Sequence, residues 1–208
     1  MSKYEKANRS EQNIKIENII SENEQIIWSS KPKKSAFIVN KIITMLPIAL
    51  IWLLFDGIFI FGIFSSDVPR QMLWFLIIFF AFHLFPVWIW LANVLSSKKT
   101  WENTEYALTN KRIIIQSGFV SMNLQTLYYT DIKNVHLRIN VIDKLLGVGD
   151  IYFNTSNGNM QAFLDIEHAS EVYPKLQKIV LDIQTDIEYP NNLRPKGNDG
   201  YNTNYNGI

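Results

Sequence analysis

Two long apolar stretches decide the fold of this chain: residues 42–64 read IITMLPIALIWLLFDGIFIFGIF, and residues 72–95 read MLWFLIIFFAFHLFPVWIWLANVL. The first contains one formal charge, Asp56, and the second contains none apart from a protonated His83. A helix of 23 residues extends roughly 34 Å, which is enough to cross a hydrocarbon core of about 30 Å. In a soluble protein of 208 residues nothing would cover two helices that are apolar on every face. We therefore predict transmembrane helices at 42–64 and 72–95.

The connector 65–71 is short, so the two predicted helices form an antiparallel hairpin in the membrane. Basic residues flank the hairpin on one side: Lys31, Lys33, Lys34 and Lys41 precede it, and Lys98, Lys99, Lys111 and Arg112 follow it, whereas only Arg70 lies in the connector. The positive-inside rule then places both termini in the cytoplasm. We expect a multi-pass protein of the cell membrane with a cytoplasmic arm at residues 1–41.

The overall composition conceals this division of the chain. A net charge of +1 and a mean hydropathy of +0.00 are typical of a soluble globular protein. The charge balance argues against nucleic acid as a partner, because no basic surplus is present to neutralise phosphates. The absence of cysteine excludes disulfides, thiolate zinc sites and cysteine nucleophiles.

Residues 101–187 change from long apolar runs to short alternating ones, which predicts a mainly β domain. We expect strands near 105–109, 112–117, 121–129, 132–139, 151–155 and 160–165, with hairpin turns at Asn110-Lys111 and Asn157-Gly158. Apolar residues at helical spacing predict a closing helix between 170 and 184, with a start just before Pro174. The Asn- and Gly-rich residues 188–208 are expected to be a disordered tail.

One run in this domain resembles a known family. Residues 105–118, EYALTNKRIIIQSG, are similar to the opening of the bacterial PH domain of YdbS-like and YdbT-like membrane proteins. The segments Ile132–Val135, Leu145–Ile151 and Glu171–Tyr173 follow in the family's order, and so does the upstream Glu24–Trp28. The resemblance covers roughly residues 22–183. It implies an antiparallel sandwich or barrel of about seven strands with a C-terminal helix, attached to a membrane α-helical hairpin.

Asp56 and His83 are the two ionisable residues inside the predicted spans. An ionisable group in a span is costly and is a functional hypothesis by default. A hairpin folded about Val68 places Asp56 opposite residue 80, and His83 lies roughly 4.5 Å deeper along the axis, so the two side chains can meet. We hypothesise a hydrogen-bonded pair. The alternatives are separate satisfaction of each group by backbone, water or another helix, or a proton or ion pathway.

A second set of candidate residues is basic and lies next to the predicted membrane. Lys98, Lys99, Lys111 and Arg112 are expected to face anionic lipid headgroups and to dock the domain on the bilayer; the alternative is an ordinary basic flank. The tryptophans Trp28, Trp88, Trp90 and Trp101 are expected at or near the inner headgroup zone.

The sequence offers no catalytic constellation, and we expect neither an enzyme nor a bound cofactor or metal. Gly147 and Gly149 lack the other residues of a nucleotide-binding loop and are interpreted as a turn. His136 and His168 have no carboxylate neighbours at metal spacing. Our main hypothesis is a binding or assembly module that joins related membrane PH proteins or forms a homo-oligomer, and contacts the lipid bilayer. The family suggests envelope maintenance or stress as its setting. The alternative is a subunit of a membrane transporter or exporter that uses Asp56 and His83.

Overall fold

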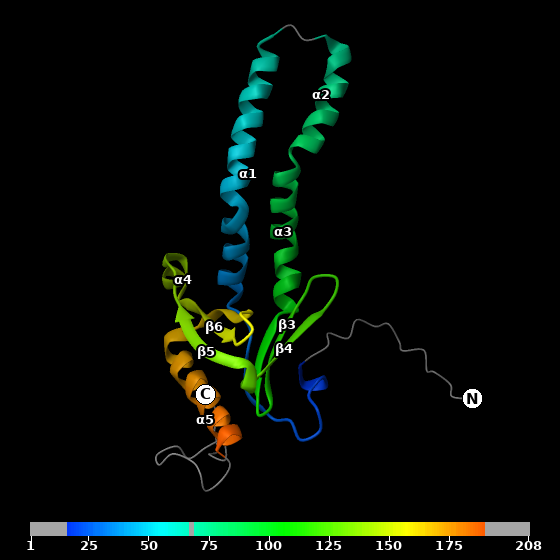
Figure 1. Cartoon of the computed structure of the whole chain (residues 1–208). Coiled ribbons are helices and arrows are strands. Elements are labelled where there is room, and N and C mark those ends of the chain that lie inside the picture. Colours follow the sequence, from blue (N-terminus) through cyan, green and yellow to red (C-terminus); the bar gives the residue numbers. More distant parts are fainter. Residues whose placement is uncertain (1–15, 67–68, 190–208) are drawn as a thin grey trace, which may run out of the picture.

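The computed structural model describes residues 16–66 and 69–189 and consists of a helix pair that projects from a β domain (Figure 1). The N-terminal segment contributes η1 (Ile16–Asn18) and β1 (Ile26–Ser30). The helix pair consists of α1 (Lys34–Phe64), α2 (Arg70–His83) and α3 (Phe85–Glu102). The remaining elements are β2 (Glu105–Thr109), β3 (Arg112–Ser117), β4 (Asn123–Tyr128), η2 (Tyr129–Asp131), β5 (Ile132–Arg138), α4 (Val141–Leu146), β6 (Val148–Thr155), β7 (Met160–Glu167) and α5 (Ala169–Glu188).

The helix α1 leads away from the β domain, and α2 and α3 return beside it (Figure 1). By length and composition α1 can cross a membrane by itself, and α2 with α3 can provide a second crossing if the bent pair is one span. The observed α1 begins at Lys34 rather than at the predicted Ile42, because residues 34–41 continue the helix from the domain to the start of the apolar stretch.

The second apolar stretch is broken, and the prediction of one continuous helix over 72–95 is wrong. The axes of α2 and α3 differ by 52° at Leu84. The physical cause is Pro86, which has no N–H to donate to the carbonyl of Phe82 and whose ring crowds that turn. Two indoles satisfy carbonyl groups at the break: Trp52 Nε1 donates to His83 O at 2.8 Å and Trp88 Nε1 to Ala81 O at 3.0 Å.

The β domain contains two antiparallel sheets, ordered β1-β2-β3-β4 and β5-β6-β7. In the first sheet Tyr106 lies opposite Ile115, and in the second Val135 lies opposite Phe153. The inward-facing residues of both sheets form one core with α5, which contributes Leu176, Ile179, Val180 and Ile183. Burying such apolar side chains is the main force that holds the two sheets together.

The predicted strands are found with small shifts in their ends, and three features differ. The strand β1 comes from the segment predicted to be an arm, and it pairs with β2. The short helix α4 was not predicted. The helix α5 begins at Ala169, so Pro174 lies inside the helix instead of at its start. The predicted tail falls almost wholly outside the described residues, as do residues 1–15 of the arm.

Candidate functional site

The junction between the helix pair and the domain is held by specific polar contacts. Trp101 Nε1, near the end of α3, donates to Pro32 O at 2.7 Å, and Lys31 Nζ donates to Glu102 O at 2.9 Å. The Nζ of Lys34 lies over the ring of Trp101, 4.9 Å from its centroid. These contacts join the start of α1 to the end of α3.

A second set of contacts joins α1 to the other sheet. The backbone N–H of Lys33 donates to Asp165 O at 2.8 Å. Its side-chain Nζ lies 3.0 Å from Glu167 Oε1 and donates to Leu146 O at 3.1 Å. One lysine therefore ties the start of α1 to β7 and to the end of α4.

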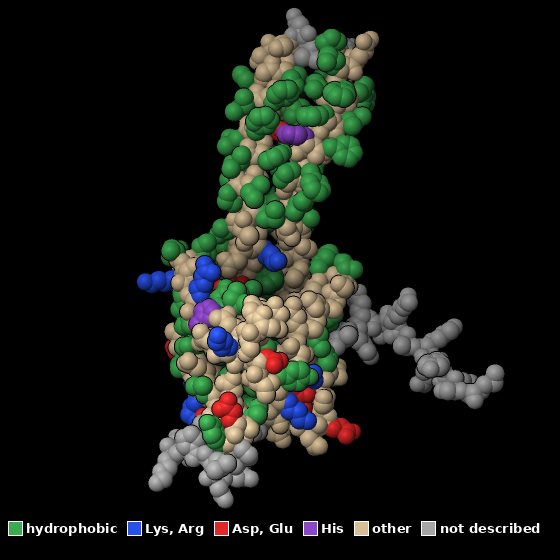
Figure 2. Space-filling view, viewed as in Figure 1, with side chains coloured by type: hydrophobic (Ala, Val, Ile, Leu, Met, Phe, Trp, Pro, Cys, Tyr) green, Lys and Arg blue, Asp and Glu red, His purple; other side chains and the backbone are tan. Residues whose placement is uncertain are grey.

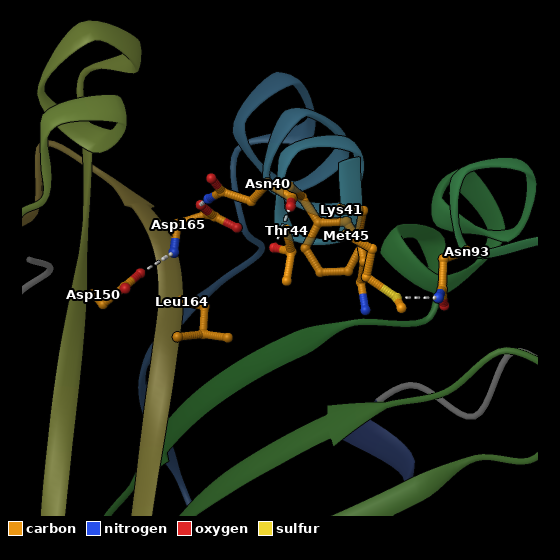
Figure 3. Close-up of a pocket in the computed structure, with 9 residues that line it drawn as sticks. Asn40, Lys41, Thr44, Met45, Asn93, Asp150, Leu164 and Asp165 are labelled. Carbon is orange, nitrogen blue, oxygen red and sulfur yellow. Dashed lines mark hydrogen bonds between the residues drawn. The ribbon is translucent and has the colours of Figure 1, made fainter. Parts of the chain in front are cut away.

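A cavity of about 400 Å³ opens at this junction, between the helix pair and the edge of the second sheet (Figure 3). Its walls come from α1, α3 and the second sheet. The lining residues are Phe37, Asn40, Lys41, Thr44 and Met45 of α1, Asn93 of α3, and Asp150, Leu164 and Asp165 of the sheet. Figure 3 shows the polar groups of Asn40, Asp150 and Asp165 clustered on one wall, with Met45 and Asn93 on the other.

Asp165 is the most unusual residue of this cavity. It is buried and has a left-handed backbone with φ of 55°. Its Oδ1 accepts from Asn40 Nδ2 at 2.6 Å, and its N–H donates to Asp150 Oδ1 at 3.0 Å. Burial raises the pKa of Asp165 to about 6, the nearby carboxylate of Asp150 adds to the rise, and the hydrogen bond from Asn40 opposes it. The cavity thus contains a buried carboxyl group whose pKa is raised well above its ordinary value.

The structure brings Asp56 and His83 together between α1 and α2. The Nδ1 of His83 lies 2.8 Å from Asp56 Oδ1. Asp56 is buried, whereas His83 is partly exposed. The helix rise of 1.5 Å per residue accounts for the contact, because it places the two residues within roughly 4.5 Å of the same depth in the hairpin, an offset that the side chains can span.

Aromatic rings surround this pair. The ring of His83 stacks on Phe79 with centroids 5.1 Å apart, and the rings of Trp52 and Phe55 lie at 5.7 and 6.2 Å. Asp56 Oδ2 is buried and has no hydrogen-bond partner among the described residues. One carboxylate oxygen is therefore engaged by His83, while the other faces an apolar surrounding.

The four predicted headgroup-docking residues do not lie together. Lys98 and Lys99 occupy the last turns of α3, beside the start of the helix pair. The strand β2 leads away from α3 and carries Lys111 and Arg112 to the opposite end of the first sheet. The prediction of a common docking surface is therefore wrong for Lys111 and Arg112, because it did not take the direction of β2 into account.

Arg112 holds the N-terminal segment instead. Its Nε and Nη2 donate to Glu24 Oε1 and Oε2 at 2.9 and 3.0 Å, and Thr109 Oγ1 donates to Glu24 Oε1 at 2.8 Å. The Ser21 N–H donates to the second carboxylate oxygen at 2.9 Å. Burial by itself would raise the pKa of Glu24, but the hydrogen bonds from Arg112, Ser21 and Thr109 lower it to about 2. Glu24 and Arg112 therefore fix the segment that leads into β1.

The tryptophans also divide into two groups. Trp90 Nε1 donates to Ile42 O at 2.9 Å, so Trp90 and Trp101 connect α3 to α1 or to the residues before it. Trp28 lies in β1 and stacks on Phe163 of the core, with centroids 5.4 Å apart. The prediction of an interfacial position is wrong for Trp28, because β1 belongs to the sheet.

The glycine pair forms a turn with defined roles. Gly147 has φ of +67° and ends α4, a position that favours glycine. Gly149 lets β6 pass close to α5, because a Cβ there would lie 2.9 Å from Ala169 Cβ. The interpretation as a turn agrees with this geometry.

The sequence reasoning missed Glu24, Asp150 and Asp165. An acidic residue inside the apolar run Phe163–Ile166 was the available signal for Asp165, because an unpaired charge is rare in a buried strand. The burial of Glu24 depends on residues 85 and more positions away, and no local pattern reports it. Within the described ranges 16–66 and 69–189, no three His, Asp or Glu side chains are arranged to hold a metal ion.

Comparison with known proteins identifies a family. Residues 42–180, which include the helix pair and most of the domain, match the family described as the bacterial PH domain. No curated protein and no solved structure matches the chain. Since the match covers two thirds of the sequence and includes β2 to β7, the chain belongs to the bacterial PH domain family.

Proposed function

We propose that this protein is a non-enzymatic membrane protein whose cytoplasmic PH domain is a binding and assembly module. The helix α1 is one span, and α2 with α3 is a second, bent span of the cell membrane. Both termini are cytoplasmic. The partner is a related membrane protein with PH domains or a second copy of this chain, and family resemblance favours a setting in envelope maintenance or stress.

The surface of the helix pair supports the membrane assignment. Its outward side chains are apolar and highly exposed in the absence of lipid: Leu54, Phe55, Ile58 and Phe61 of α1, and Trp74, Phe75 and Phe82 of α2. In Figure 2 hydrophobic side chains cover the helices, and nearly all visible charged side chains lie on the domain. An apolar surface of this size is unfavourable in water and favourable in lipid.

The observation that carries the binding role is the outer edge of β4. Five of its six residues are exposed, including Leu124 and Tyr128, and among the described strands β4 pairs only with β3. An exposed strand edge offers unpaired N–H and C=O groups, which a partner strand can satisfy. In this proposal the junction contacts fix the domain, and with it the β4 edge, relative to the helix pair.

The test is capture of partners from native membranes after cross-linking, followed by mapping of the cross-links. A stable partner that cross-links through residues 101–187 is expected. Leu124→Lys should reduce its yield several-fold, because a charged lysine on a strand edge opposes pairing. The matched control is Leu181→Lys, which changes an exposed leucine on α5. Equal loss in both variants, or no loss in either, refutes binding at β4.

The transporter alternative rests on Asp56 and His83. Both groups contact each other, which supports a structural role in joining the two spans. The alternative predicts a defined homo-oligomer with pH-dependent ion flux in vesicles that Asp56→Asn abolishes. That result would replace the binding-module proposal.

A further inference from the structure

The domain carries two apolar tips on the side of the helix pair. The β3–β4 turn (Gly118–Met122) lies beside the last turns of α3: Asn103 Nδ2 donates to Gly118 O at 3.2 Å, and Lys99 Nζ lies 6.0 Å from the ring centroid of Phe119. The helix α4 lies on the other side, beside the start of α1, where Lys33 reaches Leu146 O. Figure 1 shows both tips level with the ends of α1 and α3 that join the domain.

These tips hold the most exposed large apolar side chains of the described β domain. Val120 is 90% exposed, Leu145 82% and Val141 78%. Elsewhere in the described domain, outside the helix pair, the highest value is 57%, at Met160. Val141 and Leu145 are four residues apart and therefore lie on one face of α4. Exposure of this kind, concentrated on one side of a domain, marks a contact surface.

The length of α1 indicates what lies opposite the tips. Its 31 residues extend about 46 Å, and the hydrocarbon core accounts for about 30 Å of this. Residues 34–41, which include Lys34, Ser35, Asn40 and Lys41, then lie in the cytoplasmic headgroup layer. The tips are beside these turns, so their apolar side chains lie where apolar groups enter the boundary between headgroups and acyl chains.

The charges at the tips fit the same surroundings. Lys144 is exposed on α4 between Val141 and Leu145, and Lys99 lies over the ring of Phe119. Asp143, the acidic residue of α4, is buried and caps the helix through Asn140 instead of facing outward. Apolar residues with adjacent lysines are the pattern of a segment that inserts into an anionic lipid surface.

We propose that the β3–β4 turn and α4 insert into the cytoplasmic headgroup layer, on either side of the helix pair, and hold the domain against the bilayer. This rests on the proposed membrane anchor and specifies the surface through which the domain contacts lipid. Lipid contact at these two tips leaves the β4 edge available to a protein partner.

Because the chain has no cysteine, single cysteines can be spin-labelled in the full-length protein. We would place them at Val120 and Leu145, with Leu54 of α1 as the lipid reference and Leu181 of α5 as the aqueous reference. All four side chains are exposed, so the substitutions spare the core. The protein is reconstituted in vesicles of phosphatidylethanolamine and phosphatidylglycerol, and collisions with oxygen and with a water-soluble nickel chelate are measured.

The proposal predicts several-fold fewer nickel collisions at Val120 and Leu145 than at Leu181, with oxygen collisions nearer those at Leu54. If the collisions at Val120 and Leu145 match those at Leu181 while the collisions at Leu54 are those of a side chain in lipid, the proposed insertion of the tips is wrong and the membrane anchor stands. If Leu54 is also reached by nickel, the anchor itself fails. Shielding of the tips in native membranes but not in pure lipid vesicles would assign them to a protein and overturn the lipid contact.

Discussion

Replacing Glu24 with Gln tests whether the ion pair with Arg112 holds the N-terminal segment on the domain. The substitution keeps the shape of the side chain and removes its charge. It leaves Arg112, which is only partly exposed, without its counter-charge. Of the four hydrogen bonds that the carboxylate accepts from Ser21, Thr109 and Arg112, the two at one oxygen are also lost, because an amide NH2 donates and does not accept.

The expected cost follows from the pKa of Glu24. The pKa falls from its ordinary value of 4.5 to about 2 in the folded state. At about 1.4 kcal/mol for each pH unit, the charged form contributes about 3 kcal/mol to the free energy of unfolding at pH 7. Because the pKa is lowered by folding, this contribution is complete above pH 4.5 and is lost as the pH falls toward 2.

The assay is urea unfolding of the full chain in detergent micelles, followed by near-ultraviolet circular dichroism, which reports the packed rings Trp28, Tyr106 and Phe163. At pH 7, Glu24→Gln should lower the free energy of unfolding by about 3 kcal/mol. The difference in the free energy of unfolding between the variant and the unmodified protein should become smaller as the pH is lowered below 4.5. Glu22→Gln is the matched control, because Glu22 is exposed and its carboxylate makes no contact of this kind.

Two results would refute this reasoning. An unchanged midpoint at pH 7 would mean that the ion pair contributes nothing to stability. An equal loss at pH 7 and at pH 3 would mean that the effect comes from packing and not from the charge of Glu24.

Three further predictions concern other parts of the molecule. Asp165→Asn should raise the free energy of unfolding at pH 8 by on the order of 2 kcal/mol, because folding raises the pKa of Asp165 from 3.8 to about 6 and so disfavours its charged form. The contribution of the protonated carboxyl to the free energy of unfolding is complete below pH 3.8 and is lost as the pH rises through 6. Urea unfolding at pH 5 and pH 8 measures this. Asp56→Asn and His83→Gln should each weaken the helix pair, with a coupling energy of about 1 kcal/mol in a double-mutant cycle measured by unfolding in lipid bicelles. Gly149→Ala should destabilise the domain by about 1–3 kcal/mol in thermal unfolding, because its Cβ would lie 3.0 Å from Ile139 Cγ1 as well as against α5.

Each of these has a contrary outcome. Asp165→Asn that leaves the pH dependence between 5 and 8 unchanged would contradict a buried, titrating carboxyl. Strictly additive losses at Asp56 and His83 would show that the two groups do not act as a pair. Gly57→Ala is the control for Gly149, because a Cβ at Gly57 meets nothing within 4 Å. Equal losses at the two glycines would argue against the close approach of α5.

The sequence was sufficient where neighbouring residues determine the structure. The strands β2 and β3 have the predicted ends, because short apolar runs on both sides of the turn residues Asn110-Lys111 specify a hairpin locally. The contact between Asp56 and His83 followed from helix rise and a short connector, which are also local properties.

Features that depend on distant residues were missed. The strand β1 is short and acquires its structure by pairing with β2, so that Ser30 lies opposite Tyr106. The number of residues between Lys111 and the second apolar stretch is small, which suggests a position near the membrane. Because β2 is extended and leads away from α3, Lys111 nevertheless lies far from the helix pair. The kink before α3 had a local signal in Pro86, which the hydropathy pattern alone does not report.

The short connections at the junction have a mechanical consequence. Only residues 31–33 separate β1 from α1, and only Asn103 and Thr104 separate α3 from β2. The first connection is fixed by hydrogen bonds from Lys33 and Trp101, and the second by the hydrogen bond from Asn103 Nδ2 to Gly118 O. The domain is therefore rigidly joined to the helix pair. A tilt of the helices, such as a thinner bilayer imposes, turns the domain through a similar angle. With the helix pair in a bilayer as proposed, the angle between the β4 edge and the membrane plane therefore follows the tilt of the helices.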